Sequence, residues 1–248
     1  MPNNLAAGVF HRFEKKFILT HEQYAEIAQT LCARMKIDDN NKSGDMYHVR
    51  SLYYDTPHNS LISEALSTPR YKEKVRLRAY GKPQRDDIVF VEIKKKVNGV
   101  GSKRRIELPL NDAYMFLDCG RLPCSYEDDK AQVMREIYAI LSRNGMNLRP
   151  SALISYSRLA LDGLEDKGLR ITFDSDLRGQ THDLLLESED RGTPIIDSEH
   201  VVMEVKAPAA LPLWLTRQLS HRQTFARKFS KYRAIYQKTL KTEVSYVS

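Results

Sequence analysis

Basic residues recur at every second position along parts of this chain, a spacing that could bind a polyanion. One row comprises Lys72, Lys74, Arg76 and Arg78, and the next comprises Glu92, Lys94 and Lys96. Side chains two residues apart in a β-strand project from the same side of the sheet, so each row would form a surface of like charge. The spacing therefore predicts a polyanionic ligand lying on these rows.

The composition is that of a folded, basic protein. The chain has 248 residues, of which 42% are hydrophobic and 29% charged, so it can bury a substantial core, and we expect a single domain over residues 1–248. Its net charge of +7 implies attraction to anions such as phosphates, nucleic acid or an acidic membrane surface. Charge alone does not choose among these ligands.

The cysteines and the apolar runs indicate a cytoplasmic protein. Cys32, Cys119 and Cys124 lack metal-ligand spacing, and the N-terminus does not resemble a signal peptide. No apolar run approaches the roughly 20 residues needed to cross a bilayer, so we expect no membrane insertion by this chain. Delivery to a membrane would need a partner protein.

Periodicity predicts an antiparallel α+β fold. Eight strand-like stretches lie near residues 9–18, 46–54, 71–80, 87–97, 102–109, 150–160, 168–176 and 199–207. Asn98 and Gly99 predict a tight hairpin between the fourth and fifth. One helix is predicted from Ser125 to Gly145, and others at 21–34, 58–66, 110–118, 211–220 and 228–238. Because the helices do not alternate regularly with the strands, a parallel sheet is disfavoured.

Each predicted strand has one apolar and one charged face, and two geometries satisfy this pattern. An open sheet would show its charged face to water, whereas an eight-stranded barrel would turn that face inward around a narrow ligand. Arginines predominate on the charged face, and arginine suits phosphate oxygens, which favours the barrel. Two cations about 8 Å apart repel by about 2 kcal/mol at an effective dielectric of roughly 20, so a bound polyphosphate would relieve considerable strain.

Eight segments in order resemble the VTC domain, the polyphosphate polymerase domain of the vacuolar transporter chaperone family. They include Arg12-Phe-Glu14-Lys-Lys16, Ser51-Leu-Tyr53-Tyr54-Asp55, Val75-Arg76-Leu-Arg78, Tyr156-Ser-Arg158, Met203-Glu204-Val-Lys206 and Phe229-Ser230-Lys231-Tyr232. This domain is part of the triphosphate tunnel metalloenzyme (CYTH-like) superfamily. The resemblance runs from about residue 10 to 236 and implies an antiparallel eight-stranded barrel with a basic lumen and helices packed outside.

The resemblance also implies site residues, a cofactor and substrates. ATP and inorganic polyphosphate or triphosphate would be the substrates, with Mn²⁺ or Mg²⁺ as the metal. The family's phosphate-binding and ligand-contacting positions fall on Lys16, Arg76, Arg78, Lys94, Lys103, Tyr156, Arg158, Arg170, Lys206, Ser230 and Lys231. Glu204 matches the metal-binding glutamate, and Glu14 is either a second metal ligand or a partner that orients Lys16.

Three functions remain open at this point. Hydrolytic members of the superfamily typically begin with Glu-x-Glu-x-Lys, whereas this chain has Arg12-x-Glu14-x-Lys16, which favours a polymerase over a tunnel triphosphatase. A non-catalytic polyphosphate-binding module is the third reading. A closed tunnel would exclude duplex nucleic acid. Since the long regulatory region and membrane helices of the eukaryotic complex are missing, we expect a stand-alone module with room for a membrane or regulatory partner protein.

Several residues also have a purely structural reading. Glu204 beside Lys206 could be a cross-strand ion pair, and Ser230 with Lys231 could simply begin a surface helix. The acidic residues Glu92, Glu107 and Asp174 could orient arginines or contact metal.

Overall fold

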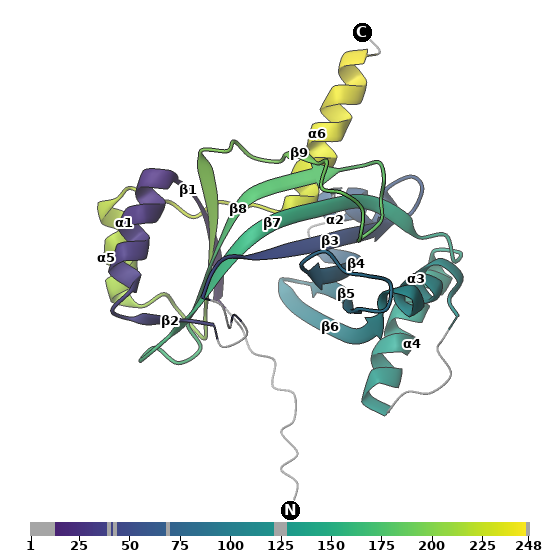
Figure 1. Cartoon of the computed structure of the whole chain (residues 1–248), viewed down its shortest axis with the longest axis horizontal. Coiled ribbons are helices and arrows are strands. Elements are labelled where there is room, and N and C mark those ends of the chain that lie inside the picture. The colour runs from purple at the N-terminus through teal and green to yellow at the C-terminus, as the bar shows by residue number, and fades with distance from the viewer. Residues whose placement is uncertain (1–12, 39–40, 42–43, 68–69, 122–127, 247–248) are drawn as a thin grey trace, which may run out of the picture. The chain divides into compact units, whose positions relative to one another are not determined.

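The computed structural model describes residues 13–38, 41, 44–67, 70–121 and 128–246 (Figure 1). The strands in these ranges are β1 (Phe13–Thr20), β2 (Met35–Ile37), β3 (Tyr47–Asp55), β4 (Tyr71–Tyr80), β5 (Ile88–Val97), β6 (Val100–Pro109), β7 (Arg149–Gly163), β8 (Arg170–Gln180), β9 (Thr193–Pro194) and β10 (His200–Ala207). The helices are α1 (His21–Leu31), α2 (Ser60–Ser67), α3 (Leu110–Cys119), α4 (Asp128–Arg143), α5 (Leu213–His221) and α6 (Lys231–Tyr246).

The strands form one antiparallel sheet, which confirms the predicted α+β class. Its order is β1-β10-β8-β7-β3-β4-β5-β6, while β2 pairs with β7 and β9 with β8. All eight predicted strands are present, and the two very short strands β2 and β9 were not predicted. The helices predicted in six places are also present, although the predicted N-cap Ser125 lies outside the described residues. In the described part of the chain no helix is long and apolar enough to cross a membrane.

The chain divides into two compact units, each described here by itself. The first unit comprises Met1–Met46, Arg158–Ser175 and Ser198–Phe229, and the second comprises Tyr47–Ser157, Asp176–Asp197 and Ser230–Ser248. The long strands β7 and β8 contribute residues to both units. The predicted single domain stays a prediction.

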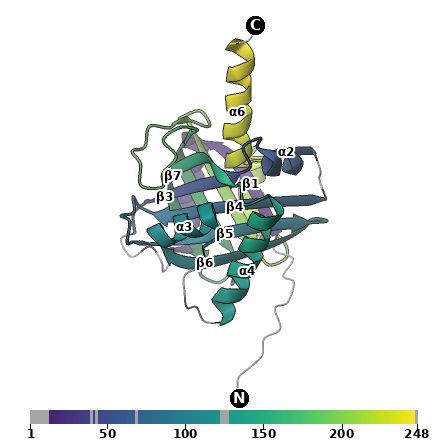
Figure 2. The same cartoon turned by 90° about the vertical axis from the view of Figure 1, so that its right-hand side faces the viewer.

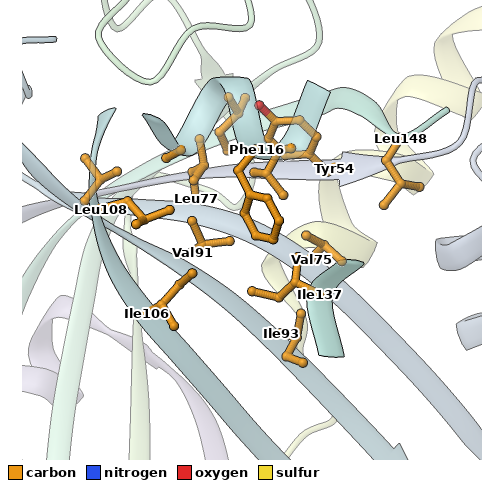
Figure 3. Close-up of a cluster of buried hydrophobic side chains, with 14 of the residues drawn as sticks. Tyr54, Val75, Leu77, Val91, Ile93, Ile106, Leu108, Phe116, Ile137 and Leu148 are labelled. Carbon is orange, nitrogen blue, oxygen red and sulfur yellow. The ribbon is translucent and has the colours of Figure 1, made fainter. Parts of the chain in front are cut away.

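The core of the second unit lies between the sheet and two helices. Val75, Leu77, Val91, Ile93 and Ile106 project from β4, β5 and β6 toward Phe116 of α3 and Ile137 of α4 (Figure 3). Figure 2 shows both helices in front of these three strands. These strand residues form the apolar face that the alternation predicted, so the opposite face of the same strands carries the charged rows.

A tight turn fixes the register of β5 and β6. Asn98 and Gly99 adopt positive φ angles of 48° and 89°, and Val97 lies opposite Val100. Positive φ at both central residues is what a two-residue hairpin of matching twist requires. The turn therefore sets Glu92 opposite Arg105 and Lys94 opposite Lys103.

The first unit has its own core beneath α1 and α5. Ile27 and Leu31 of α1 and Leu215 and Leu219 of α5 pack with the apolar faces of β1, β8 and β10 (Figure 1). Thr20 begins α1 with a capping box, in which its hydroxyl accepts the backbone N–H of Gln23. The charged faces of β1, β8 and β10 lie opposite this core.

Candidate functional site

The charged row of β4 is buried at its centre. Arg76 and Arg78 are 7% and 8% exposed, and Glu92 on β5 is fully buried. An open sheet that turned this face to water would leave these side chains exposed, so the solvent-face reading is wrong at these positions. Toward the other end of the row Lys72 and Lys74 are half-buried, and Lys94 and Lys96 on β5 are exposed.

Glu92 joins two cations from neighbouring strands. Arg76 Nε donates to Glu92 Oε2 at 2.7 Å, and Lys103 Nζ lies 2.5 Å from Oε1. Burial alone would raise the pKa of Glu92, but the positive charges, Arg76 foremost, lower it well below its ordinary value. Burial lowers the pKa of Lys103 despite this ion pair. Glu92 thus orients Arg76, which is one of the two roles that its position allowed.

Arg78 contacts a hydroxyl on either side. Its Nη2 donates to Tyr156 Oη at 3.1 Å, and its Nε donates to Ser51 Oγ at 3.3 Å. The ammonium of Lys231 lies over the Tyr156 ring, 4.4 Å from the centroid. Residues from β3, β4, β7 and α6 therefore meet around Arg78.

The beginning of α6 is seated on this face. Lys74 Nζ donates to Ser230 Oγ at 3.0 Å, and Tyr232 Oη donates to the buried Asp55 Oδ2 at 2.8 Å. Ser230 and Lys231 are accordingly held against the sheet and do more than begin a surface helix. We call Tyr53, Lys74, Arg76, Arg78, Glu92, Lys103, Tyr156, Ser230 and Lys231 the Arg76 cluster.

Lys94 stands at the margin of the Arg76 cluster. It lies opposite Lys74 on β4 and Lys103 on β6, so three lysines share one cross-strand row. Its side chain is exposed, whereas the arginines farther along are buried. The cationic face therefore continues from buried arginines to exposed lysines.

In the first unit, Lys16 and Glu204 form the centre of a second group. Lys16 Nζ lies 3.4 Å from Glu14 Oε1 and 3.7 Å from Glu204 Oε2, and Lys206 Nζ lies 2.5 Å from Glu204 Oε1. Lys16 Nζ also donates to the backbone carbonyl of Phe229 at 3.2 Å. Glu204 does make the ion pair with Lys206 that its spacing suggested. We call Glu14, Lys16, Thr172, Glu204 and Lys206 the Glu204 cluster.

The two remaining arginines are held by aspartates of the first unit. Arg158 binds the fully buried Asp174 through both carboxylate oxygens, at 2.6 and 2.8 Å. Arg170 pairs with Asp38 and, at 3.3 Å, with Asp162. Bidentate pairing fixes a guanidinium in one orientation. Asp174 thus orients an arginine, while Glu107 is exposed on β6.

The Glu204 cluster suits a hard divalent cation. Among the described residues no group of three or more His, Cys, Asp or Glu side chains could hold a metal. Mg²⁺ and Mn²⁺, however, are commonly held by one or two carboxylates together with substrate phosphates and water. Glu14 and Glu204 both contact one ammonium, so both could contact one cation. Thr172 lies directly opposite Glu204, and its buried hydroxyl oxygen has no hydrogen-bond partner among the described residues.

Sequence reasoning missed some members of these groups. Tyr53 and Tyr232 occur within the segments that resemble the VTC domain, but no role was assigned to them. Tyr53 alternates with Ser51 and lies opposite Arg76, so strand periodicity combined with the β3–β4 register would have identified it. Asp38 could not have been found, since its contact with Arg170 joins residues far apart in the sequence.

Comparisons with known proteins bear on both the family and the fold. The model of the VTC domain family matches residues 11–240. A candidate adenylyl cyclase from Hippeastrum, described as having a dominant triphosphatase activity, matches with a TM-score of 0.55 and 14% identity. The match covers 91% of this chain and 95% of that chain. At this identity the likeness shows a shared fold.

Two bacterial structures described as candidate adenylate cyclases match less well. The one from Vibrio parahaemolyticus has a TM-score of 0.46 and 12% identity, covering 91% of this chain and 97% of that chain. The one from Bacillus halodurans has a TM-score of 0.45 and 14% identity, covering 92% and 87%. No curated protein matches the sequence significantly.

Proposed function

This chain belongs to the VTC domain family, and from that premise we propose that it is a polyphosphate polymerase that extends inorganic polyphosphate from ATP. The observation that carries the proposal is the Arg76 cluster, where five cations from the three elements β4, β6 and α6 accompany the single carboxylate Glu92. Arginines that are buried, oriented and gathered in one place suit a ligand with many anionic oxygens. A chain of phosphates is such a ligand.

The reaction needs little covalent help from the protein. A terminal oxygen of the polyphosphate chain attacks the γ-phosphorus of ATP, the bond to the β–γ bridging oxygen breaks, and ADP leaves. Positioning and neutralisation of the phosphate oxygens supply most of the rate enhancement in such transfers. A terminal phosphate has a second pKa near 6, so it is mostly ionised at neutral pH and the acceptor needs no strong general base.

Each named residue has a place in this proposal. Arg76 and Arg78 would neutralise phosphate oxygens, and Lys94, Lys103, Tyr156, Ser230 and Lys231 would bind the same chain. In the first unit Lys16, Arg158, Arg170 and Lys206 would bind phosphate. Glu204 and Glu14 would hold Mn²⁺ or Mg²⁺, which would supply positive charge that neutralises the phosphates. We further propose that the protein works in the cytoplasm without inserting into a membrane or binding duplex nucleic acid.

Incubation with γ-labelled ATP and a divalent metal tests the proposal. A polymerase places the label in polyphosphate that lengthens with time. The second candidate, a triphosphatase, is favoured by the shared fold with the Hippeastrum protein and would release labelled orthophosphate instead. Binding of polyphosphate without either product would leave only a binding module and would overturn the proposed transferase activity.

Two variants assign the activity to the Arg76 cluster. Arg76→Ala and Arg78→Ala should each lower turnover at least a hundredfold, because a charge-stabilising donor is typically worth this much. Arg104→Ala is the matched control, since Arg104 is half-exposed on β6 and contacts Glu136 at 3.8 Å outside the cluster. Equal activity of all three variants would place the chemistry elsewhere.

A further inference from the structure

Tyr53 lies within the Arg76 cluster. It stands opposite Arg76 in the β3–β4 register and is only 7% exposed. Its hydroxyl oxygen accepts a hydrogen bond from Arg76 Nη1 at 3.1 Å, and the Arg76 guanidinium carbon lies 5.8 Å from the ring centroid. The phenol oxygen thus lies beside the guanidinium that would meet a phosphate.

The ring of Tyr53 is fixed in place by Tyr232. The two rings stack with centroids 4.5 Å apart and planes 13° from parallel. Tyr232 is itself held, since its hydroxyl contacts Asp55 Oδ2 at 2.8 Å and Ser151 Oγ at 3.1 Å. The stacking therefore helps to hold the Tyr53 ring where its hydroxyl meets Arg76.

The hydroxyl of Tyr53 has a donor capacity that the protein does not use. A phenol can accept a hydrogen bond and also donate one, and Arg76 uses only the accepting side. Among the residues that the structure describes, no group accepts a hydrogen bond from the Tyr53 hydroxyl. A buried donor without an acceptor is costly, so a ligand oxygen at this place would satisfy it.

We propose that the Tyr53 hydroxyl is a further phosphate-binding donor of this site, and that it binds an anionic oxygen only as the neutral phenol. The inference rests on the proposed function, because the oxygen it would contact belongs to the phosphate chain bound by Arg76 and Arg78. A negatively charged phenolate in the same place would repel the phosphate. Phosphate binding and protonation of Tyr53 are therefore coupled.

The surroundings of Tyr53 set the pH at which this coupling operates. Burial alone would raise the pKa of Tyr53, but the nearby cations, Arg76 foremost, outweigh burial and lower the pKa to about 8. The charged groups that act on it are Arg76, Lys74 and Arg78 of β4, and the titratable Tyr232 of α6 stacks on its ring. Glu92 and Lys103 lie beyond Arg76, and Tyr156 and Lys231 lie beyond Arg78.

The sign of the effect follows from the charges. Below pH 8 the empty site already holds the neutral phenol, so phosphate binding costs no proton uptake. Above pH 8 the phenolate must first be protonated, and affinity should fall by up to about tenfold per pH unit. The charge of the phosphate chain changes little there, since its second pKa is near 6. The pKa of Lys103 is also lowered, so loss of its positive charge would weaken phosphate binding further at high pH. That part of the loss in affinity does not depend on Tyr53.

Calorimetric titration with tripolyphosphate from pH 7 to pH 9 separates these contributions. Because Tyr53 is about half ionised at pH 8, the native protein should lose about fivefold in affinity between pH 8 and pH 9. Tyr53→Phe should bind about three- to tenfold more weakly at pH 7, as expected for one lost hydrogen bond, and should lose less than threefold between pH 8 and pH 9. Tyr138→Phe is the control, because Tyr138 is an exposed tyrosine of α4.

The ultraviolet absorbance of tyrosinate gives a readout that needs no turnover. A rise with a midpoint near pH 8 should occur in the native protein and in Tyr138→Phe but not in Tyr53→Phe, and tripolyphosphate should move that midpoint upward. The inference is overturned if Tyr53→Phe binds tripolyphosphate with native affinity and native pH dependence. Failure of the native protein to bind tripolyphosphate at pH 7 would instead overturn the proposed function on which the inference rests.

Discussion

At the scale of single residues, the buried carboxylate of Glu92 positions the cations of the Arg76 cluster. Its carboxylate is the only one in the cluster and contacts Arg76 and Lys103 at once. Removing one partner of a buried ion pair leaves the other charge uncompensated, which is more costly than the pair is stabilising. Glu92 therefore holds in place the two cations, Arg76 and Lys103, that we propose to bind phosphate.

Glu92→Gln should destabilise the protein by about 3 kcal/mol at pH 7, because Arg76 loses its buried countercharge. Urea denaturation measures this difference, and tripolyphosphate should reduce it by supplying negative charge. Asp176→Asn is the control, since Asp176 pairs with Arg178 at an exposed position. A loss as small as the control's would contradict the role given to Glu92.

The stability difference between the native protein and Glu92→Gln should also depend on pH. Its folded pKa is lowered, so its stabilising effect is complete above the ordinary glutamate value, about 4.3, and is lost as the pH falls toward the folded pKa. The gap between the native protein and Glu92→Gln should therefore narrow by about 1.4 kcal/mol for each pH unit below about 4. A gap that widened in acid would mean that Glu92 is not ionised in the folded protein.

At the scale of elements, the candidate residues Ser230 and Lys231 lie just before and at the start of α6, and Tyr232 anchors its first turn. Tyr232→Phe keeps the stacking on Tyr53 but removes the hydroxyl that binds Asp55 and Ser151. We expect a loss of about 1–3 kcal/mol in unfolding free energy, because a buried carboxylate loses a donor. Weaker tripolyphosphate binding should accompany it, since Ser230 and Lys231 are then less firmly positioned.

Tyr236→Phe is the matched control one turn farther along α6. Tyr236 Oη contacts Ser63 Oγ at 3.1 Å, away from the Arg76 cluster. The Tyr236→Phe variant should therefore bind tripolyphosphate with native affinity. If both variants weakened binding equally, the helix as a whole, and not its first turn, would be responsible.

The β5–β6 hairpin depends on the backbone of its turn. Gly99 has φ 89° and nothing within 4 Å of an added Cβ, so Gly99→Ala should cost only the backbone strain, about 1–2 kcal/mol. Gly101→Ala would meet its nearest atom at 3.9 Å and has no positive φ, and should be neutral. Thermal unfolding of the two variants compares them. Equal melting temperatures would show that the turn does not set the register.

Most elements could be predicted because the period-2 and helical patterns are long and strong. The charged and apolar faces of β4 and β5 followed from the same alternation. The partner of each charge could not be predicted, because it depends on the register between strands and on long-range contacts such as that of Arg170 with Asp38. For the same reason Arg50 gave no signal that it would be buried and donate to the carbonyls of Leu186 and Ser188.

At the scale of the whole molecule, the net charge of +7 and the cationic clusters predict a specific response to phosphate. A ligand that binds only the folded protein stabilises it by about 2.7 kcal/mol at a hundred times its dissociation constant. For a chain of this size that is roughly 5–10 °C in melting temperature. Chloride at equal ionic strength should give a much smaller shift. Equal shifts would indicate general screening and no phosphate site.

The order of the strands ends at β6, and β6 bears Lys103, Arg104 and Arg105 in succession. A strand at the end of a sheet exposes unpaired backbone groups to which another chain could add, and lysine and arginine discourage such addition. All three side chains are exposed. Copies of the protein that approached one another edge to edge would therefore meet with repelling charge, so the same cations that suit phosphate also oppose self-association.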